Sequence, residues 1–193
     1  MNRVITQALA AGALLALAAC SQNQLVEAKR ITVGGAVSID PQITWTRLAN
    51  LDYLEGKGEM WTVDGPGLHS LTFFTSIGDG QTLYKPRPNV NLPAFKGDMT
   101  PIDVMELVQA TYQLQANAQT DGRDVRPVKI GGRDGFRFDM SVVGRDEVER
   151  EATALGWIKD KKLNLIIYSG AKLHYYPKYQ PSVERIFASV SGN

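Results

Sequence analysis

Cysteine is almost absent from this sequence of 193 residues, because Cys20 is the only one. A single cysteine forms no disulfide within the chain, so the folded part must be stabilised by its hydrophobic core. Histidine is also scarce, with only His69 and His174. We therefore expect no metal site built from histidine and cysteine, and the sequence indicates no cofactor.

An excess of charge of one sign is missing as well. The formal net charge is +1, and residues 1–20 contain Arg3 and no acid, so the remainder carries 20 basic and 20 acidic side chains. Binding to a phosphate backbone requires clustered positive charge, so we expect no nucleic-acid partner. The hydrophobic content of 44% and charged content of 21% are typical of one globular domain.

The chain also lacks an apolar run long enough to span a bilayer, which takes roughly 20 residues. Its N-terminal stretch MNRVITQALAAGALLALAAC has the order of a secretory signal: Arg3, an apolar region over about 4–17 that is interrupted by Thr6 and Gln7, and then small residues. We therefore interpret residues 1–19 as a signal peptide and not as a spanning anchor.

The end of this segment explains the lone cysteine. Ordinary signal peptidase requires small residues three positions and one position before the cut, and Leu17 is too large for a cut before Cys20. The stretch Leu17-Ala18-Ala19-Cys20 resembles the bacterial lipobox. That resemblance implies diacylation of the Cys20 sulfur, cleavage before it, and acylation of the new amino group. The alternatives are cleavage after Ala18 with an incidental cysteine, or a cytosolic chain with an apolar start.

The residue after the cysteine is Ser21 and not aspartate. In a diderm bacterium, the resemblance to lipoproteins then implies anchoring at the periplasmic face of the outer membrane. We expect residues 20–30 to form a lipidated cysteine and a polar tether, and residues 31–193 to form a single domain.

The first half of this domain is rich in strand patterns. Two β segments over 31–39 are broken at Gly34 and Gly35, another strand surrounds Trp45, and a pair of strands flanks the turn at residues 64–67. In the stretch LHSLTFFTSIG, alternate residues share a face. We expect the face that carries Leu71, Phe73 and Ile77 to be the core side.

A helix is predicted over residues 100–117. Thr100 is a natural N-cap, Pro101 occupies the permitted first helical position, and Asp103 completes a capping box. Apolar residues recur at helical spacing and predict one broad face against a sheet. These residues are Ile102, Met105, Val108 and Tyr112, with Val104, Leu107 and Leu114 at the margins.

Four more strand patterns follow in succession and predict an antiparallel meander. A last helix over residues 181–190 is opened by Pro181 and buries Val183, Ile186, Phe187 and Val190. The fold class is therefore α+β: an antiparallel sheet with helices packed on it, in a layered α/β/α sandwich.

The order of elements from about residue 31 to the C-terminus resembles the PsbP-like superfamily, which includes a eukaryotic Ran-binding protein of the Mog type. The resemblance is carried by the strand that ends in Trp45, the capped central helix, and the stretches GRDGFRF, LNLIIYSG and PSVERIFASV. It implies a small secreted or lipid-anchored protein that acts by binding.

No catalytic residues are indicated. Asp64, His69 and Ser70 suggest a serine triad, but adjacent residues on a strand point to opposite faces. The glycine pairs lack the spacing of a phosphate-binding loop and are interpreted as turns. Glu147, Glu149 and Glu151 alternate along one strand and are expected to share a solvated face.

Two stretches are candidate surfaces for a partner. Residues 78–99 form a long proline-containing connection with Tyr84, Lys85, Arg87 and Phe95. The alternative is a crossover that packs Tyr84 and Phe95 over a sheet edge. The stretch KLHYYPKYQP places Tyr175 and Tyr176 beside lysines, which suits an interface or, alternatively, core packing before the last helix.

The sequence thus predicts a lipid-anchored, non-catalytic envelope protein that binds another envelope protein or a small hydrophobic ligand. Its partners would be the membrane, through the anchor, and an envelope protein. The sequence leaves the oligomeric state open. An envelope hydrolase with an unrecognised site is the alternative. A pocket with convergent polar groups would favour the hydrolase, and a shallow surface would favour the binder.

Lipidation of Cys20 is directly testable. Labelled palmitate should enter the protein in its native host, because the lipobox cysteine is the acceptor, and Cys20→Ala should abolish the incorporation. Radioactivity or fluorescence of the purified band measures the result. Equal labelling of wild type and variant would show that the interpretation is wrong.

Overall fold

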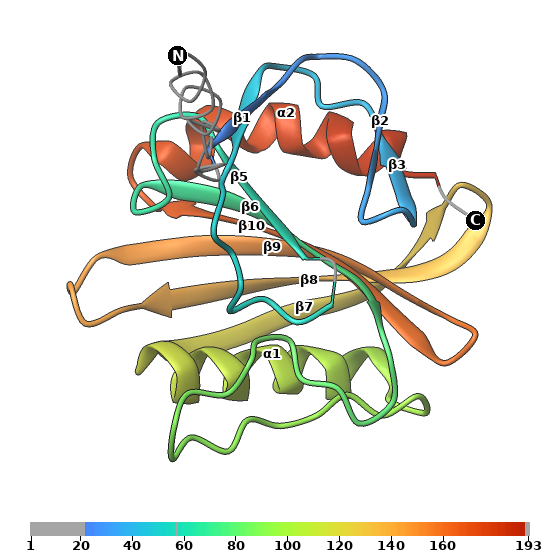
Figure 1. The fold of residues 1–193 in the computed structure, drawn as a ribbon, viewed down its shortest axis with the longest axis vertical. Coiled ribbons are helices and arrows are strands. Elements are labelled where there is room, and N and C mark those ends of the chain that lie inside the picture. Colours follow the sequence, from blue (N-terminus) through green and yellow to red (C-terminus); the bar gives the residue numbers. More distant parts are fainter. Residues whose placement is uncertain (1–21, 57, 192–193) are drawn as a thin grey trace, which may run out of the picture.

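The computed structural model describes residues 22–56 and 58–191, which form one sheet with helices on both faces (Figure 1). Among these residues the large sheet has eight strands, and all neighbouring strands are antiparallel. Their order across the sheet is β1 (Gln24–Val26), β4 (Trp45–Arg47), β5 (Glu59–Thr62), β6 (His69–Ile77), β10 (Lys162–Ala171), β9 (Glu149–Lys159), β8 (Arg133–Val143) and β7 (Gln119–Ile130).

The sheet is covered differently on its two sides. Helix α1 (Pro101–Ala116) packs on β7 and β8, whereas α2 (Tyr175–Ser189) packs on β9 and β10 from the opposite side (Figure 1). A small hairpin of β2 (Ile31–Val33) and β3 (Val37–Ile39) lies beside α2. The predicted α+β class with an α/β/α layering is confirmed, as is the meander of β7 to β10.

Each face of the sheet has its own hydrophobic core. The core on the α2 side contains Trp45, Trp61 and Tyr168, and the core on the α1 side contains Leu107 and Phe138. The two cores are separate because the sheet lies between them. Successive residues of a central strand can therefore both be buried, one in each core.

Strand β6 shows this most clearly and corrects the sequence interpretation. Phe73 and Phe74 are neighbours on opposite faces, and both are fully buried. Near the end of the strand, the residues expected on one core face no longer share that face. Ser76 has a positive φ of 58°, the pairing with β10 shifts register, and Ile77 joins Phe74 on the α1 side. Sequence alternation could not show that helices cover both faces.

The start of α1 is as predicted, but its buried face is not. The Thr100 hydroxyl accepts a hydrogen bond from the Asp103 N–H at 3.3 Å, and the Asp103 carboxylate accepts one from the Thr100 N–H at 2.7 Å. The buried residues are Val104, Leu107, Val108 and Thr111. Ile102 and Leu114 are about half exposed, because the helix meets β7 with a narrower face than the apolar stripe suggested.

Helix α2 starts six residues earlier than predicted. It begins at Tyr175, and Pro181 lies inside it on the exposed side. The Tyr168 hydroxyl on β10 bonds to the carbonyl oxygens of Tyr175 and Tyr176 at 2.7 and 3.1 Å. These contacts hold the first turn on the sheet and outweigh the unfavourable proline. The predicted burial of Val183, Ile186, Phe187 and Val190 is confirmed.

The folded domain begins earlier than residue 31. Strand β1 pairs with β4 within the range that was expected to be a tether. The amide oxygen of Asn23 also accepts a hydrogen bond from the Ala49 N–H at 2.9 Å. Cys20 and the predicted signal peptide lie outside the described residues. Within the described residues, no helix is both long enough and apolar enough to cross a membrane.

Gly170 on β10 allows the close approach of α2 and provides a test of this packing. A Cβ atom at this position would lie 2.9 Å from the backbone nitrogen of Tyr176, which cannot yield as a side chain can. We expect Gly170→Ala to lower the free energy of unfolding by about 1–3 kcal/mol, the usual range for overpacking. Denaturant unfolding measures the change.

Gly67→Ala is the matched control, because no atom lies within 4 Å of its added Cβ. That variant should keep the wild-type stability. If the two variants proved equally stable, the contact between β10 and the first turn of α2 would not be the constraint described above.

Candidate functional site

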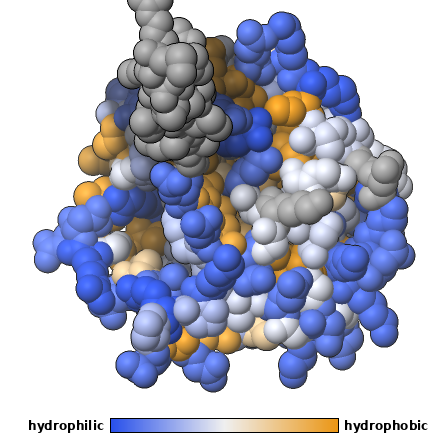
Figure 2. Space-filling model, viewed as in Figure 1, coloured by the Kyte–Doolittle hydropathy of each residue, from blue (hydrophilic) through white to orange (hydrophobic). Residues whose placement is uncertain are grey.

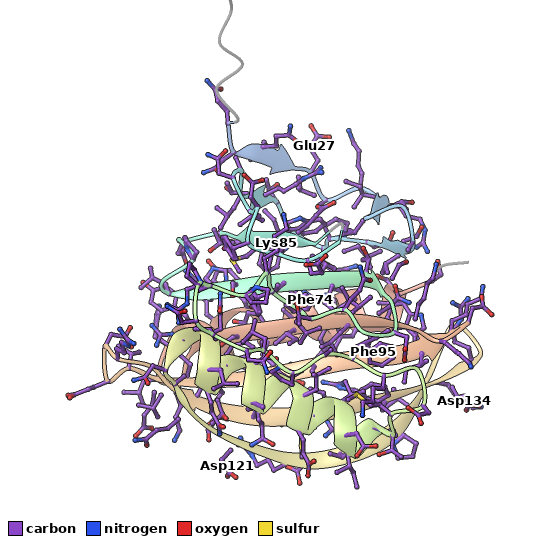
Figure 3. All side chains as sticks on the ribbon, turned by 60° about the horizontal axis from the view of Figure 1, so that its bottom comes forward. Glu27, Phe74, Lys85, Phe95, Asp121 and Asp134 are labelled. Atoms are coloured by element: carbon purple, nitrogen blue, oxygen red, sulfur yellow. The ribbon has the colours of Figure 1, made fainter. Side chains whose placement is uncertain are left out.

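The loop at residues 78–99 covers the core more than it presents a surface. Phe95 is fully buried and packs in the core on the α1 side, and Figure 3 shows it with Phe74 in the body of the domain. The Tyr84 ring lies 5.4 Å from the Phe74 ring and 6.1 Å from the Tyr53 ring. Phe95 is therefore not available to a partner, and Tyr84 and Phe95 match the alternative of a packed crossover.

The exposed cations of this loop are Lys85, Arg87 and Lys96. The Lys85 side chain faces solvent, and the Arg87 guanidinium donates to the Leu114 carbonyl at 3.3 Å. Burial raises the pKa of the Tyr84 phenol well above its usual value, so this group stays protonated. Of the four residues proposed for this loop, Lys85 and Arg87 are exposed, and a role of the loop in binding stays a prediction.

The other two predicted contact residues, Tyr175 and Tyr176, form the first turn of α2 and are half-buried. They point to different neighbours. The Tyr175 ring lies 6.2 Å from the His69 ring, and the Tyr176 ring stacks on Tyr168 at 5.3 Å. The start of α2 thus joins two polar clusters, which are described in turn.

The first cluster surrounds His69, which is 2% exposed. Its Nε2 accepts hydrogen bonds from the N–H groups of Val63 and Asp64, both at 3.2 Å. Its ring stacks on Tyr179 with 4.3 Å between centroids. Its Nδ1 is buried and has no hydrogen-bond partner among the described residues. Burial lowers the pKa of His69 to about 4, so the ring is neutral at pH 7.

The Asp64 carboxylate contacts α2 and does not form a catalytic triad with His69 and Ser70. Its carboxylate accepts hydrogen bonds from Lys178 Nζ at 2.8 Å and from the Tyr179 hydroxyl at 2.6 Å, and both contacts lower its pKa. Since Nε2 of His69 is used by backbone N–H groups, it is not placed to take a proton from Ser70. We interpret this cluster as a structural joint between the β5–β6 turn and α2.

The second cluster is an open face of charged residues on β7, β8 and β9. Along β8, Phe136 and Phe138 point to the α1 side, so Arg137 and Asp139 point to the α2 side. Helix α2 packs mainly on β9 and β10 and reaches β8 through Glu184, so Arg123 and Arg126 at the far edge stay about 40% exposed. We call this surface the ionic face. It comprises Arg123, Arg126, Arg137, Asp139 and Glu151 of the sheet and Glu184 of α2.

The ionic face is a set of paired arginines and carboxylates. Arg137 makes a two-pronged contact with Glu184, with both N–O distances 2.7 Å, and also donates to Thr153 Oγ1 at 3.1 Å. Arg126 contacts the Asp139 carboxylate at 3.0 Å. Arg123 pairs with Glu151. These carboxylate contacts raise the pKa of Arg123 and Arg137, which therefore stay charged.

Tyr176 lies at the margin of this face. Burial raises its pKa to about 12, and the negative charges of Asp139 and Glu151 act in the same direction. Two shallow hollows border the same surface. One of about 190 Å³ lies beside Arg137 and Glu184, and one of about 220 Å³ is lined by residues that include Glu151 and Lys172. The face is thus uneven, polar and accessible.

A larger hollow of about 420 Å³ lies between the loop at residues 78–99 and α1. Its lining includes the charged residues Lys96, Asp98, Asp103 and Glu106. Figure 2 shows mostly hydrophilic residues in the lower part of the view, where α1 lies. Within residues 22–56 and 58–191, no group of three or more histidine, cysteine or acidic residues is arranged to hold a metal ion.

The sequence does not predict the ionic face. Glu147, Glu149 and Glu151 were expected to share one solvated face, yet the Glu151 side chain is only 17% exposed because it pairs with Arg123. A signal was present in the stretch FRFDMSVV, where apolar and polar residues alternate. The polar half of such a strand becomes a site only when the register of the neighbouring strands and the position of α2 are known, and the predicted meander specified neither.

The neutral His69 predicts a specific dependence of stability on pH. Its folded-state pKa is depressed, so the unfolded chain binds more protons between the two pKa values, and stability falls as the pH drops from about 6.5 toward 4. Allowing for solvent screening, His69 should account for a loss of about 2 kcal/mol between pH 7 and pH 4.5.

Denaturant unfolding at both pH values measures this loss. His69→Phe should remove that part of the pH dependence while lowering stability at pH 7, and His174→Gln, which changes an exposed ring, should keep it. An unchanged pH dependence in His69→Phe would contradict the assignment of a buried neutral imidazole.

Comparison of the sequence with protein-family models and with curated proteins gives no match. Comparison of the fold with solved structures does. The solution structure of cyanobacterial PsbP (CyanoP) from Synechocystis sp. PCC 6803 superposes with a TM-score of 0.55 at 14% sequence identity, over 90% of this chain and 94% of that chain. At this identity the likeness concerns the fold. The chain therefore contains a domain with the PsbP-like fold.

Proposed function

We propose that this protein is a lipid-anchored, non-catalytic protein of the bacterial cell envelope, held at the periplasmic face of the outer membrane, that binds another envelope protein through its ionic face. The observation that carries the proposal is the set of paired arginines and carboxylates on this face, of which Arg123 and Arg126 are about 40% exposed. The anchor is supported by the lipobox that ends in Cys20 and by the presence of Ser21 after it.

The ionic face is poorly explained as a source of stability. Exposed ion pairs contribute about 0–1 kcal/mol each, and buried pairs often contribute no more than apolar residues of the same size. The same charges are effective in recognition, because complementary charge speeds encounter and excludes wrong partners. Arginine and tyrosine are also enriched at interfaces, and the face contains three arginines with Tyr176 at its margin.

A protein partner fits better than a small hydrophobic ligand. Ligand pockets are concave and mostly apolar. Here the large apolar residues of the central strands are close to fully buried, and each hollow at the surface includes charged residues in its lining. A polar surface bordered by shallow hollows suits contact with another protein better than a small apolar ligand.

Within the described residues, Asp64, His69 and Ser70 are not arranged as a hydrolase triad. A nucleophile needs a base in hydrogen-bond contact and a third group that orients the base. His69 uses its Nε2 for two backbone N–H groups, and Asp64 is bound by Lys178 and Tyr179. These contacts support a non-catalytic role, and they leave the binding proposal as the one to test.

Charge reversal separates the two candidate surfaces. We expect Arg123→Glu with Arg126→Glu to reduce capture of the partner from detergent-solubilised envelopes at least tenfold. Both arginines are about 40% exposed, and the glutamates introduced in their place would repel the acids that the arginines now pair with. Quantitative mass spectrometry of the captured proteins measures the effect, after thermal unfolding has shown that the variant is folded.

Lys85→Glu with Arg87→Glu is the matched variant, with the same change of charge on the loop at residues 78–99. It should capture the partner as the wild type does. Loss of capture in this variant, with normal capture in the ionic-face variant, would transfer the binding site to the loop and contradict the proposal.

A further inference from the structure

The first described residues fix where the chain enters the fold. Asn23 is tied to Ala49 by its side-chain amide, and β1 pairs with β4 from Gln24, opposite Arg47, to Val26, opposite Trp45. Strand β1 is the outermost strand on this side of the sheet. The chain that precedes Asn23 therefore leaves the domain at the β1 edge.

This edge carries exposed apolar and aromatic side chains. Val26 points into the core on the α2 side, so Leu25 points the other way, and it is 70% exposed. Leu48 and Met60 are half-buried on the same side, and the Leu48 N–H donates to the Met60 carbonyl at 2.9 Å. Tyr53 is 42% exposed. We call Leu25, Leu48, Tyr53 and Met60 the edge patch.

Tyr53 is held in a defined place within the patch. Its ring stacks on Tyr84 at an interplanar angle of 9°, and its hydroxyl lies 4.0 Å from the Met60 sulfur. Its carbonyl accepts a hydrogen bond from the Lys85 N–H at 2.8 Å. An exposed cation therefore borders the apolar surface. Figure 3 shows Lys85 on the side of the molecule toward Glu27, which follows β1.

The distance between the anchor and this patch is short. Three peptide units separate Cys20 from Asn23, and a fully extended chain of that length spans no more than about 11 Å. If Cys20 carries acyl chains in the bilayer, the β1 edge cannot move far from the membrane surface. This step rests on the lipid anchor of the proposed function.

We propose that the edge patch lies against the lipid bilayer, so that the anchored domain has a fixed orientation. Leucine and methionine bury apolar area at the headgroup boundary, tyrosine is enriched at membrane interfaces, and lysine extends its charge toward the headgroups. The domain then stands on the β1 edge, with its strands roughly parallel to the membrane plane.

This orientation places the ionic face away from the membrane. Strands β7 and β8 are at the other end of the strand order, and Figure 3 shows Asp121 of β7 opposite Glu27. At about 4.8 Å between neighbouring strands, β7 lies roughly 30 Å from β1. The ionic face is thereby presented to the periplasm, where a partner could reach it.

Site-directed fluorescence tests the orientation in the mature lipoprotein. An acylated Cys20 has no free thiol, so single cysteines introduced at Leu25 or Tyr53 are the only labelling sites for an environment-sensitive dye. Leu173 and Ile102, which are 95% and 54% exposed and lie in the β10–α2 turn and on α1, provide matched control positions. The labelled proteins are inserted into vesicles of phosphatidylethanolamine and phosphatidylglycerol that contain brominated lipid.

We expect Leu25→Cys and Tyr53→Cys to be quenched severalfold more strongly than Leu173→Cys and Ile102→Cys. Intact-mass spectrometry of the same samples reports acylation. A protein without acyl mass would overturn the anchor and this inference together. An acylated protein with equal quenching at all four positions, or with the strongest quenching at Leu173 or Ile102, would overturn the orientation and leave the anchor intact.

Discussion

The architecture depends on the burial of both faces of the central strands. Strands β6, β10 and β9 carry apolar side chains on both sides, so each face needs a cover of its own. The two helices cover only part of this area. The β2–β3 hairpin and the loop at residues 78–99 cover more, and Gly34 at the hairpin tip approaches β6 so closely that a Cβ would overlap Thr75. The loop at residues 78–99, which the sequence suggested as a binding surface, thus covers the core.

The uncovered part of the sheet is where function is expected. Helix α1 packs on β7 and β8 on one side, whereas on the other side α2 packs mainly on β9 and β10 and reaches β8 through Glu184. The far part of this side, with Arg123 and Arg126, stays exposed. A face in this position cannot be apolar without inviting aggregation. Paired arginines and carboxylates occupy it instead. The two sides of β8 therefore differ: Phe138 packs in the core on one side, and Asp139 pairs with Arg126 on the other.

Local chemistry predicted what depends on a few neighbouring residues. The capping box of Thr100 and Asp103 predicted the start of α1, and the meander of β7 to β10 was predicted from turns and alternation. Features that depend on distant partners were missed. Pro181 suggested a helix start, but Tyr168 and Gly170, remote in sequence from that proline, place the start at Tyr175. The ionic face was missed for the same reason, since its pairs join residues from four elements.

The central claim is that the ion pairs of this face serve recognition and not stability. The free energy of unfolding of a variant in which Arg126 and Asp139 are both replaced, by methionine and leucine, tests it most directly, because the two charges are removed together and neither is left unpaired. We expect the free energy of unfolding of this variant to lie within about 1 kcal/mol of the wild-type value. A loss of several kcal/mol would contradict it and would make the ionic face a structural element of the fold.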